Sequence, residues 1–218
     1  MSVLTKSDFY DQAYFTVKGQ KGGYCKDSFE LSNHWHLNLA KLWFKQLPGD
    51  KVNKQILDVG CARGNVVYWL ERKFNMNAYG VDVSKWCIEN SHCPAKVKYS
   101  DISKSVDFDD EKFDFLVCRD VLEHISKKDI NKTISEFHRV LKHGGYVALA
   151  PRTNRAGKED KKKSSPNIDP SHVLIKDPWW WVKRIEACHF TWLPRETIKA
   201  CSTTMAMSYD WDILVFRK

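Results

Sequence analysis

Two segments of the sequence place a carboxylate a few positions before a histidine. Asp169 precedes His172 by three positions, and Asp120 precedes His124 by four. A neutral imidazole can accept a proton near pH 7, and a carboxylate beside it can orient the ring. This pattern favours general-base chemistry on a poor nucleophile such as a hydroxyl group, and a structural role for each histidine is the alternative. The candidate catalytic residues are His172 as the first choice of base, then Asp120, Asp169 and His124.

The same side chains are also suitable ligands for a metal ion. Carboxylate oxygens and imidazole nitrogens bind divalent cations, so Asp120, Asp169 and His172 could share one if the fold brings them together. The seven cysteines are scattered and contain no C-x-x-C pair, which argues against a thiolate zinc site. The sequence therefore permits a metal without predicting one.

The elements that must position these residues begin with the stretch Gln55–Asn65. An apolar run is followed by the small residues Gly60, Ala62 and Gly64, and then by apolar residues at three- and four-residue spacing. This order predicts a strand, a tight turn and an amphipathic helix. Such a turn lets the backbone approach a ligand, and the helix N-terminus points N–H groups at it. Asn65 stands at the third glycine position of the G-x-G-x-x-G fingerprint, which disfavours a nicotinamide oxidoreductase.

A second carboxylate supports a nucleoside-binding site. The segment 78–84 is typical of a strand that ends at Asp82, about 20 residues beyond the glycine turn, where a βαβ unit carries its ribose-binding acid. The alternative is that Asp82 only caps the next helix. The segment 96–102 is typical of a third strand, which ends near Asp101 and Ile102.

Strands and helices then alternate along the chain. A helix is expected at about 29–46, and another at 129–142 with His143–Gly145 as its C-cap. Strands are expected at 113–120 and 146–150, and later at 191–193 and 211–216. Alternation of this kind implies a parallel sheet with helices on both faces. Residues 151–170 are expected to form a mobile substrate loop at the edge where such sheets bind ligands.

Size and composition limit the class of protein. The 218 residues suit one domain with a substantial core, which we divide into an N-terminal lid and helix (1–50), a binding core (51–150) and a substrate loop with a C-terminal hairpin (151–218). No apolar run is long enough to span a bilayer, and the unpaired cysteines favour a reducing, cytoplasmic location. The net charge of +8 raises the prospect of nucleic acid as a partner, although part of it lies in the lysine run 158–163.

The motifs resemble those of class I S-adenosylmethionine (SAM) methyltransferases. Asp58-x-Gly60-x-Ala62-x-Gly64 is similar to their first motif, in which alanine at the middle position is unusual, and Asp120–Ile125 resembles the fourth-strand motif of the type 11 and type 12 groups. The resemblance implies a Rossmann-like fold with a mostly parallel seven-stranded sheet, helices on both faces and a C-terminal antiparallel hairpin. It also implies SAM as the cofactor, with adenine bound at Asp101 and Ile102. The expected cofactor-binding residues are Tyr24, Asp58, Gly60, Cys61, Ala62, Gly64, Asp82, Val83, Asp101, Ile102 and Arg119.

A narrower resemblance concerns the acceptor. Lys21–Tyr24, the segment Asp169–Val173 and the tryptophan run Trp179–Trp181 together look like small glycan-associated sugar O-methyltransferases of bacteria and large algal viruses. This implies methyl transfer to a sugar hydroxyl, and at least one of the three tryptophans is expected to line the acceptor pocket. An RNA methyltransferase, a small-molecule O-methyltransferase and a non-catalytic SAM-binding module are the alternatives. The sequence makes no prediction of oligomeric state.

Overall fold

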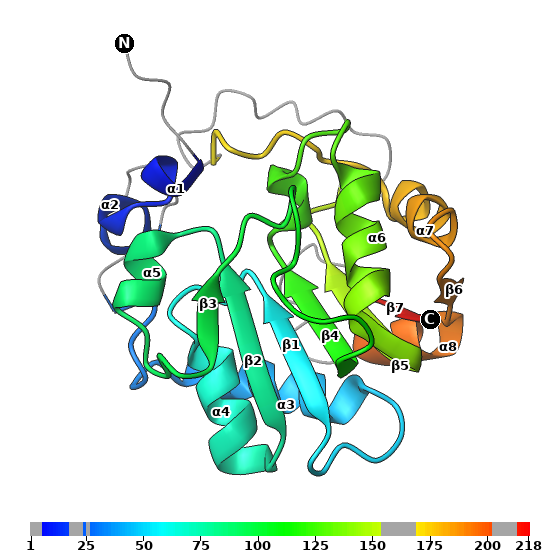
Figure 1. Ribbon diagram of the computed structural model, residues 1–218, viewed down its shortest axis with the longest axis horizontal. Helices are drawn as coiled ribbons and strands as arrows, with labels where there is room; N and C mark the ends of the chain where they lie inside the picture. The colour runs from blue at the N-terminus through cyan, green and yellow to red at the C-terminus, as the bar shows by residue number, and fades with distance from the viewer. Residues whose placement is uncertain (1–5, 18–23, 25–26, 154–168, 202–212) are drawn as a thin grey trace.

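A single seven-stranded sheet forms the centre of the molecule (Figure 1). The computed structural model describes residues 6–17, 24, 27–153, 169–201 and 213–218. The strand order is β3-β2-β1-β4-β5-β7-β6. The strands are β1 Gln55–Val59, β2 Asn77–Asp82, β3 Val97–Tyr99, β4 Phe113–Arg119, β5 Leu141–Ala150, β6 Thr191–Trp192 and β7 Leu214–Arg217.

The sheet is parallel except at one edge. The strands β1 to β5 pair in parallel, and β7 pairs antiparallel with both β5 and β6. The predicted fold class is therefore confirmed, including the antiparallel C-terminal strands. The structure adds a helix that the sequence did not predict: α8, Pro194–Cys201, lies between β6 and β7 and replaces a tight hairpin.

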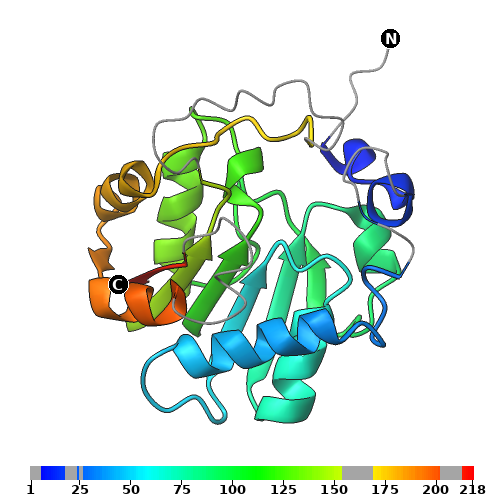
Figure 2. The same cartoon turned by 180° about the vertical axis from the view of Figure 1, so that it is seen from behind.

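Helices cover both faces of the sheet (Figures 1 and 2). On one face α3, His34–Gln46, and α4, Asn65–Phe74, bury Trp43, Leu70 and their neighbours against β1 and β4. On the other face α6, Ile130–Val140, and α7, Pro178–Glu186, bury Phe137 and Trp181. The two cores account for the apolar runs in the central strands, which are buried on both sides. No helix of the described residues is long and apolar enough to cross a bilayer.

Short helices complete the edge of the sheet where the parallel strands end. They are α1 Lys6–Phe9, α2 Gln12–Thr16, α5 Lys85–Glu89 and the 3₁₀ turn η1 Leu122–His124. Side-chain caps set several helix starts, because Asp11, Asn33, Ser84 and Asp177 each accept a hydrogen bond from a backbone N–H of the first turn.

Two local expectations were wrong. The helix expected at 129–142 ends at Val140, and Gly144 and Gly145 lie inside β5 instead of capping the helix. The register of β4 against β5 shifts between Phe113 and Phe115, so these glycines allow an irregularity in the strand. Of the three consecutive tryptophans, Trp181 is fully buried in the core and Trp179 is 63% exposed, and none of the three is among the described residues that line the cavity considered next.

Candidate active site

A cavity of about 460 Å³ lies at the carboxyl ends of β1, β2 and β4. Open α/β sheets bind their ligands at this edge. The cavity extends from Asp82 and Asp101, at the ends of β2 and β3, to Asp120 and His124, after β4. Its size suits one cofactor with part of an acceptor.

The glycine turn forms the floor of the cavity. Gly60 has φ +77°, and a Cβ added there would lie 2.1 Å from Val121 Cγ2. The N–H groups of Gly60 and Cys61 donate to the Val81 carbonyl at 2.9 and 3.1 Å, which ties the turn to β2. Only a residue without a side chain fits this left-handed, crowded position. Gly64, with φ +78°, is not among the described lining residues and forms the N-cap of α4.

The unusual alanine at the middle position of the motif, Ala62, adopts a backbone conformation that glycine prefers. Its φ is +48°, in the left-handed region that glycine adopts without strain. Its methyl group packs with Tyr14, Phe15 and Cys87, and its N–H donates to Asp82 Oδ2 at 2.8 Å. Burial of the methyl group contributes about 0.8 kcal/mol, which offsets part of the left-handed strain of about 1 kcal/mol.

Two buried carboxyl groups face the cavity beneath this turn. Asp82 accepts N–H groups from Ala62 and Ser84, one on each oxygen at 2.8 Å, and each oxygen keeps a lone pair for a ligand. Burial raises the pKa of Asp82 and raises that of Asp58 to about 7, the second with a contribution from Asp82. A ligand that donates hydrogen bonds or carries positive charge would stabilise the ionised form of both carboxyl groups.

The other expected cofactor residues lie around the same cavity. Val83, Ile102, Cys61 and Arg119 all line it. Asp101 also lines it, while its Oδ1 accepts from the Ser103 hydroxyl at 2.6 Å. The Arg119 guanidinium lies 4.5 Å from the Trp35 ring centroid and is the only cation among the described lining residues.

Aromatic side chains from the N-terminal segment cover the cavity. Tyr10, Tyr14 and Phe15 of the α1–α2 segment line it together with Tyr24 and Phe29, and the rings pack on one another with centroids 4.9 to 6.2 Å apart. We call this segment, residues 6–17, the roof. The Tyr10 carbonyl accepts from Ser84 Oγ at 2.6 Å, and the Tyr14 hydroxyl donates to Asp169 Oδ2.

The four candidate catalytic residues come together at one end of the cavity. Asp120 and His124 line it, whereas Asp169 and His172 are not among its described lining residues and lie behind them. Asp120 has φ +52°, and burial raises its pKa to about 6 against the opposing effect of Arg119 and Arg152. His124 and His172 have ring centroids 4.8 Å apart, and burial together with His172 lowers the pKa of His124 to about 4.

Asp169 orients His124 through Ser171. Its Oδ1 accepts both the N–H and the hydroxyl of Ser171, and Ser171 Oγ lies 2.8 Å from His124 Nδ1. The backbone carbonyl of Asp169 accepts from the His172 N–H at 3.2 Å. The Asp169 carboxylate therefore reaches His124 through Ser171, whereas the spacing suggested a pairing with His172.

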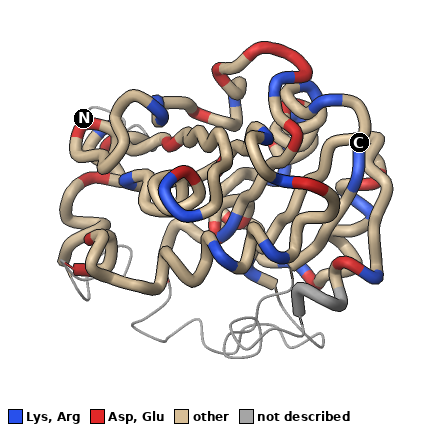
Figure 3. The backbone as a smooth tube through the Cα atoms, turned by 90° about the horizontal axis from the view of Figure 1, so that it is seen from below, with Lys and Arg blue, Asp and Glu red and all other residues tan. Residues whose placement is uncertain are grey.

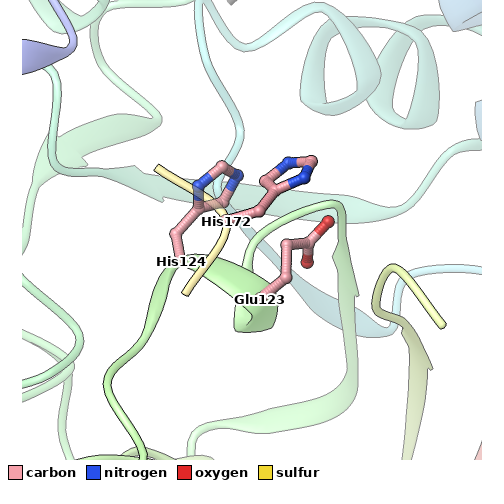
Figure 4. Close-up of side chains that lie close together, drawn as sticks. All are labelled: Glu123, His124 and His172. Carbon is pink, nitrogen blue, oxygen red and sulfur yellow. The ribbon is translucent and has the colours of Figure 1, made fainter. Parts of the chain in front are cut away.

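Two residues at the site were missed by the sequence interpretation. His36 of α3 is 5% exposed and lines the cavity, and burial lowers its pKa to about 4. Glu123 is fully buried beside His124 and His172 (Figure 4). The adjacent Glu123 and His124, which follow β4 in the sequence, were the signal from which the role of Glu123 could have been inferred.

The fold and cavity define a class of α/β protein that binds a nucleoside-containing cofactor at the carboxyl ends of parallel strands. A model of the methyltransferase domain family matches residues 32–203. The chain therefore belongs to the methyltransferase domain family, in agreement with the resemblance seen in its motifs.

Individual relatives are similar over part of their length. Phosphoethanolamine N-methyltransferase 3 of Arabidopsis thaliana is 27% identical over 106 residues, or 45% of this chain and 21% of that protein. Methyltransferase GfsG of Streptomyces halstedii is 28% identical over 116 residues, or 49% of this chain and 40% of that protein. The chain thus matches less than half the length of either relative.

Solved structures support the fold. Phosphoethanolamine N-methyltransferase 2 of Haemonchus contortus, in complex with S-adenosyl-L-methionine, aligns with a TM-score of 0.73 and 18% identity, over 99% of this chain and 60% of that one. The [4+2]-cyclase SpnF aligns with a TM-score of 0.63 and 19% identity, over 84% and 80% of the two chains. Since the same fold carries different reactions, the acceptor must be argued from the site.

Proposed function

We propose that this protein transfers a methyl group from SAM to a hydroxyl group of a sugar or glycoside. The observation that supports this most is the continuity of the cavity, from the Asp82 carboxylate at the ribose position to Asp120 and His124. The end of the cavity assigned to the cofactor and the end with the acid–base residues are therefore continuous.

The residues of the cavity suit the cofactor. The Gly60 turn leaves room for close approach, and Asp82 has lone pairs for the two ribose hydroxyls. Asp101 and Ile102 are assigned to the adenine, and Arg119 and Tyr24 to the methionine end of the cofactor, whose carboxylate is anionic. Four lining aspartates, Asp58, Asp82, Asp101 and Asp120, favour a ligand with net positive charge, as SAM carries.

The acceptor must lose a proton when it is methylated. When bound, the cofactor supplies a methyl group whose bond to sulfur breaks as the bond to the acceptor oxygen forms, which leaves S-adenosylhomocysteine. The hydroxyl proton goes to the imidazole pair at the β4 end, with His124 facing the cavity and His172 behind it. Ser171 and Asp169 hold the pair, so that the ring needs no reorientation during the reaction.

The charges around the cavity favour a neutral acceptor over a phosphorylated one. Arg119 is the only cation among the described lining residues, and it is assigned to the cofactor. A phosphate group would meet the four aspartates without a further described cation to balance it. The hydroxyl and carboxylate groups near His124 suit a polyol, and the rings of Tyr10 and Tyr14 suit the C–H faces of a sugar.

The excess of acidic groups also favours a second candidate acceptor, a small amine without phosphate. An ammonium group would be attracted to Asp120, and an amine needs no strong base once it is neutral. The chain is similar to phosphoethanolamine N-methyltransferases, which by name methylate an amine, and this similarity supports the amine candidate. An RNA acceptor is less favoured, because basic and acidic residues are intermingled over the described chain (Figure 3), and several lysines are paired, such as Lys96 with Glu71 and Lys142 with Asp114.

The cofactor assignment predicts the effect of Asp82→Ala. Loss of the carboxylate removes two acceptors of ribose hydrogen bonds, so we expect S-adenosylhomocysteine to bind about 100-fold more weakly, because hydrogen bonds to a charged group contribute about 1.5 kcal/mol or more each. Isothermal titration calorimetry measures this. Asp109→Ala, at a position outside the described cavity lining, is the control and should leave the affinity unchanged. Unaltered binding by the Asp82 variant would reject the ribose site.

The acceptor is identified by methyl transfer itself. The protein is incubated with isotopically labelled SAM and matched panels of glycosides, small amines, phosphorylated amines and RNA, and products are detected by mass spectrometry. We expect label on a glycoside oxygen and none on RNA or phosphoamines. Label on nitrogen only would replace the sugar proposal with the amine one, and cofactor binding without any product would support the binding-module alternative.

A further inference from the structure

Three side chains with metal-binding atoms converge behind the acceptor end of the cavity. One ligand atom from each of Glu123, His124 and His172 lies within 4.8 Å of the others (Figure 4). Glu123 and His124 come from η1, and His172 comes from the segment that precedes α7. The set differs from the one considered from the sequence, because the Asp169 carboxylate is engaged by Tyr14 and Ser171.

The Glu123 carboxylate is an unexplained buried group. It is 0% exposed, and neither Oε1 nor Oε2 has a hydrogen-bond partner. The Glu123 and Arg152 amides are near enough to favour the charge without forming such a bond. A buried carboxylate without a partner costs several kcal/mol. A cation between this carboxylate and the two imidazoles would remove that cost, and Figure 4 shows the carboxylate directed toward His172.

The hydrogen bond between His124 and Ser171 uses Nδ1 of the His124 ring and leaves Nε2 to bind a metal ion. The single Ser171 hydroxyl hydrogen is donated to Asp169, so Ser171 Oγ accepts from His124 Nδ1–H. Nε2 then carries the lone pair that a metal ligand needs. In metal sites, a hydrogen bond to the second ring nitrogen commonly fixes the tautomer of a metal-binding histidine. Ser171, held by Asp169, makes that hydrogen bond with His124.

The backbone holds the two parts of the cluster together. The Glu123 carbonyl accepts N–H groups from both Val173 and Leu174 at 2.9 Å. His172 is therefore fixed beside η1, although about fifty residues separate it from Glu123 and His124 in the sequence. A metal ion would bind to a site whose main-chain framework already exists.

We propose that Glu123, His124 and His172 bind a divalent transition-metal ion, for which zinc is the first choice. Two imidazoles and one carboxylate favour zinc, manganese or iron over magnesium or calcium, and three protein ligands leave a position open for a substrate. A zinc ion about 2.1 Å from each ligand atom places these atoms roughly 3.4 Å apart. The side chains must therefore close by on the order of 1 Å, a movement that needs no shift of the main chain.

The site would act on the acceptor, and this part rests on the proposed function. His124 lines the cavity, so the open metal position faces the space assigned to the acceptor hydroxyl. A coordinated hydroxyl group is more acidic than a free one, and its proton passes to the Asp120 carboxylate as its oxygen forms the bond to the methyl carbon. In the metal-bound protein His124 and His172 are both ligands, so Asp120 takes the place of the imidazole pair as the base.

Metal binding is tested without reference to activity. The full chain is stripped with a chelator and titrated with Zn²⁺ by calorimetry and with Co²⁺ by absorption spectroscopy. We expect one tight site, with a Co²⁺ spectrum free of thiolate charge-transfer bands. His124→Ala, His172→Ala and Glu123→Gln should each weaken Zn²⁺ binding by about 100-fold or more, as loss of a ligand exceeds the effect of losing an outer partner.

The matched control is His189→Ala, which changes one ring of the His138–His189 pair outside the site and should leave Zn²⁺ affinity unchanged. S-adenosylhomocysteine binding should be the same in all four variants, which shows that they fold. No stoichiometric Zn²⁺ binding, or binding that survives the three ligand variants, would overturn the metal site. A wild-type protein that binds Zn²⁺ but methylates no glycoside would keep the site and reject only the acceptor.

Discussion

Gly60→Ala is expected to abolish S-adenosylhomocysteine binding and to lower the free energy of unfolding by about 3 kcal/mol, the sum of left-handed backbone strain and overpacking. A Cβ at this position lies 2.1 Å from Val121 Cγ2, at φ +77°. Either the turn moves, which closes the cavity floor, or Val121 moves, which displaces the start of η1. Chemical denaturation and calorimetry measure the two effects.

Gly49 offers a matched control for this experiment. Its φ is also +77°, but a Cβ there meets nothing within 4 Å. Gly49→Ala should therefore cost only the strain, about 1 kcal/mol, and should leave cofactor binding intact. The double variant Gly60→Ala, Val121→Ala removes the Cγ2 atom and should recover part of the lost stability. Equal losses for Gly49→Ala and Gly60→Ala would show that close packing at the turn is unimportant.

Glu123→Gln is expected to reduce the pH dependence of the stability of the metal-free protein. Burial, with a contribution from Asp120, raises the pKa of Glu123 to about 8 in the folded state. A raised folded pKa means that the stabilisation is complete below the unfolded pKa and is lost as pH rises through 8. Between pH 6 and pH 8 the wild type should lose about 2 kcal/mol more than Glu123→Gln.

Glu136 provides the opposite case. Its hydrogen bond with Arg139 lowers the pKa of Glu136, so its contribution is present above the unfolded pKa and does not change between pH 6 and pH 8. Glu136→Gln should lower stability equally at both values. Urea denaturation of chelator-treated protein at the two pH values measures the difference. Parallel losses in wild type and Glu123→Gln would mean that Glu123 is already ionised at pH 6.

The parallel half of the fold was predictable because its signals are local. The apolar runs of β1, β2 and β4 are each followed by a turn or cap residue, such as Gly64 or Ser84, and those residues do what their types suggest. The exceptions arose where tertiary contacts decide. Gly144 and Gly145 were taken as a helix C-cap, but β4 and β7 recruit residues 141–150 into one long strand. The helix α8 follows a short strand and was missed.

The site was predictable where one motif contains the whole arrangement. Residues 58–64 and Asp82 lie together because one βαβ unit places them there. His36 and Glu123 were missed because their surroundings come from distant segments. His36 packs beside the ring of Phe29, and the charge of Arg119 contributes to its lowered pKa. Glu123 lies beside His172 because the segment 171–174 is hydrogen-bonded to the Glu123 carbonyl. Histidine spacing alone likewise paired Asp169 with His172, whereas the fold inserts Ser171 between Asp169 and His124.

The roof joins the two halves of the cavity through one short stretch of chain. At one end it is fastened to Ser84, two residues from Asp82, and at the other to Asp169, which reaches His124 through Ser171. Only five residues, from Tyr10 to Tyr14, span the two anchors. A substitution that loosens either anchor should therefore disturb both ends of the cavity, because the same five residues cover them.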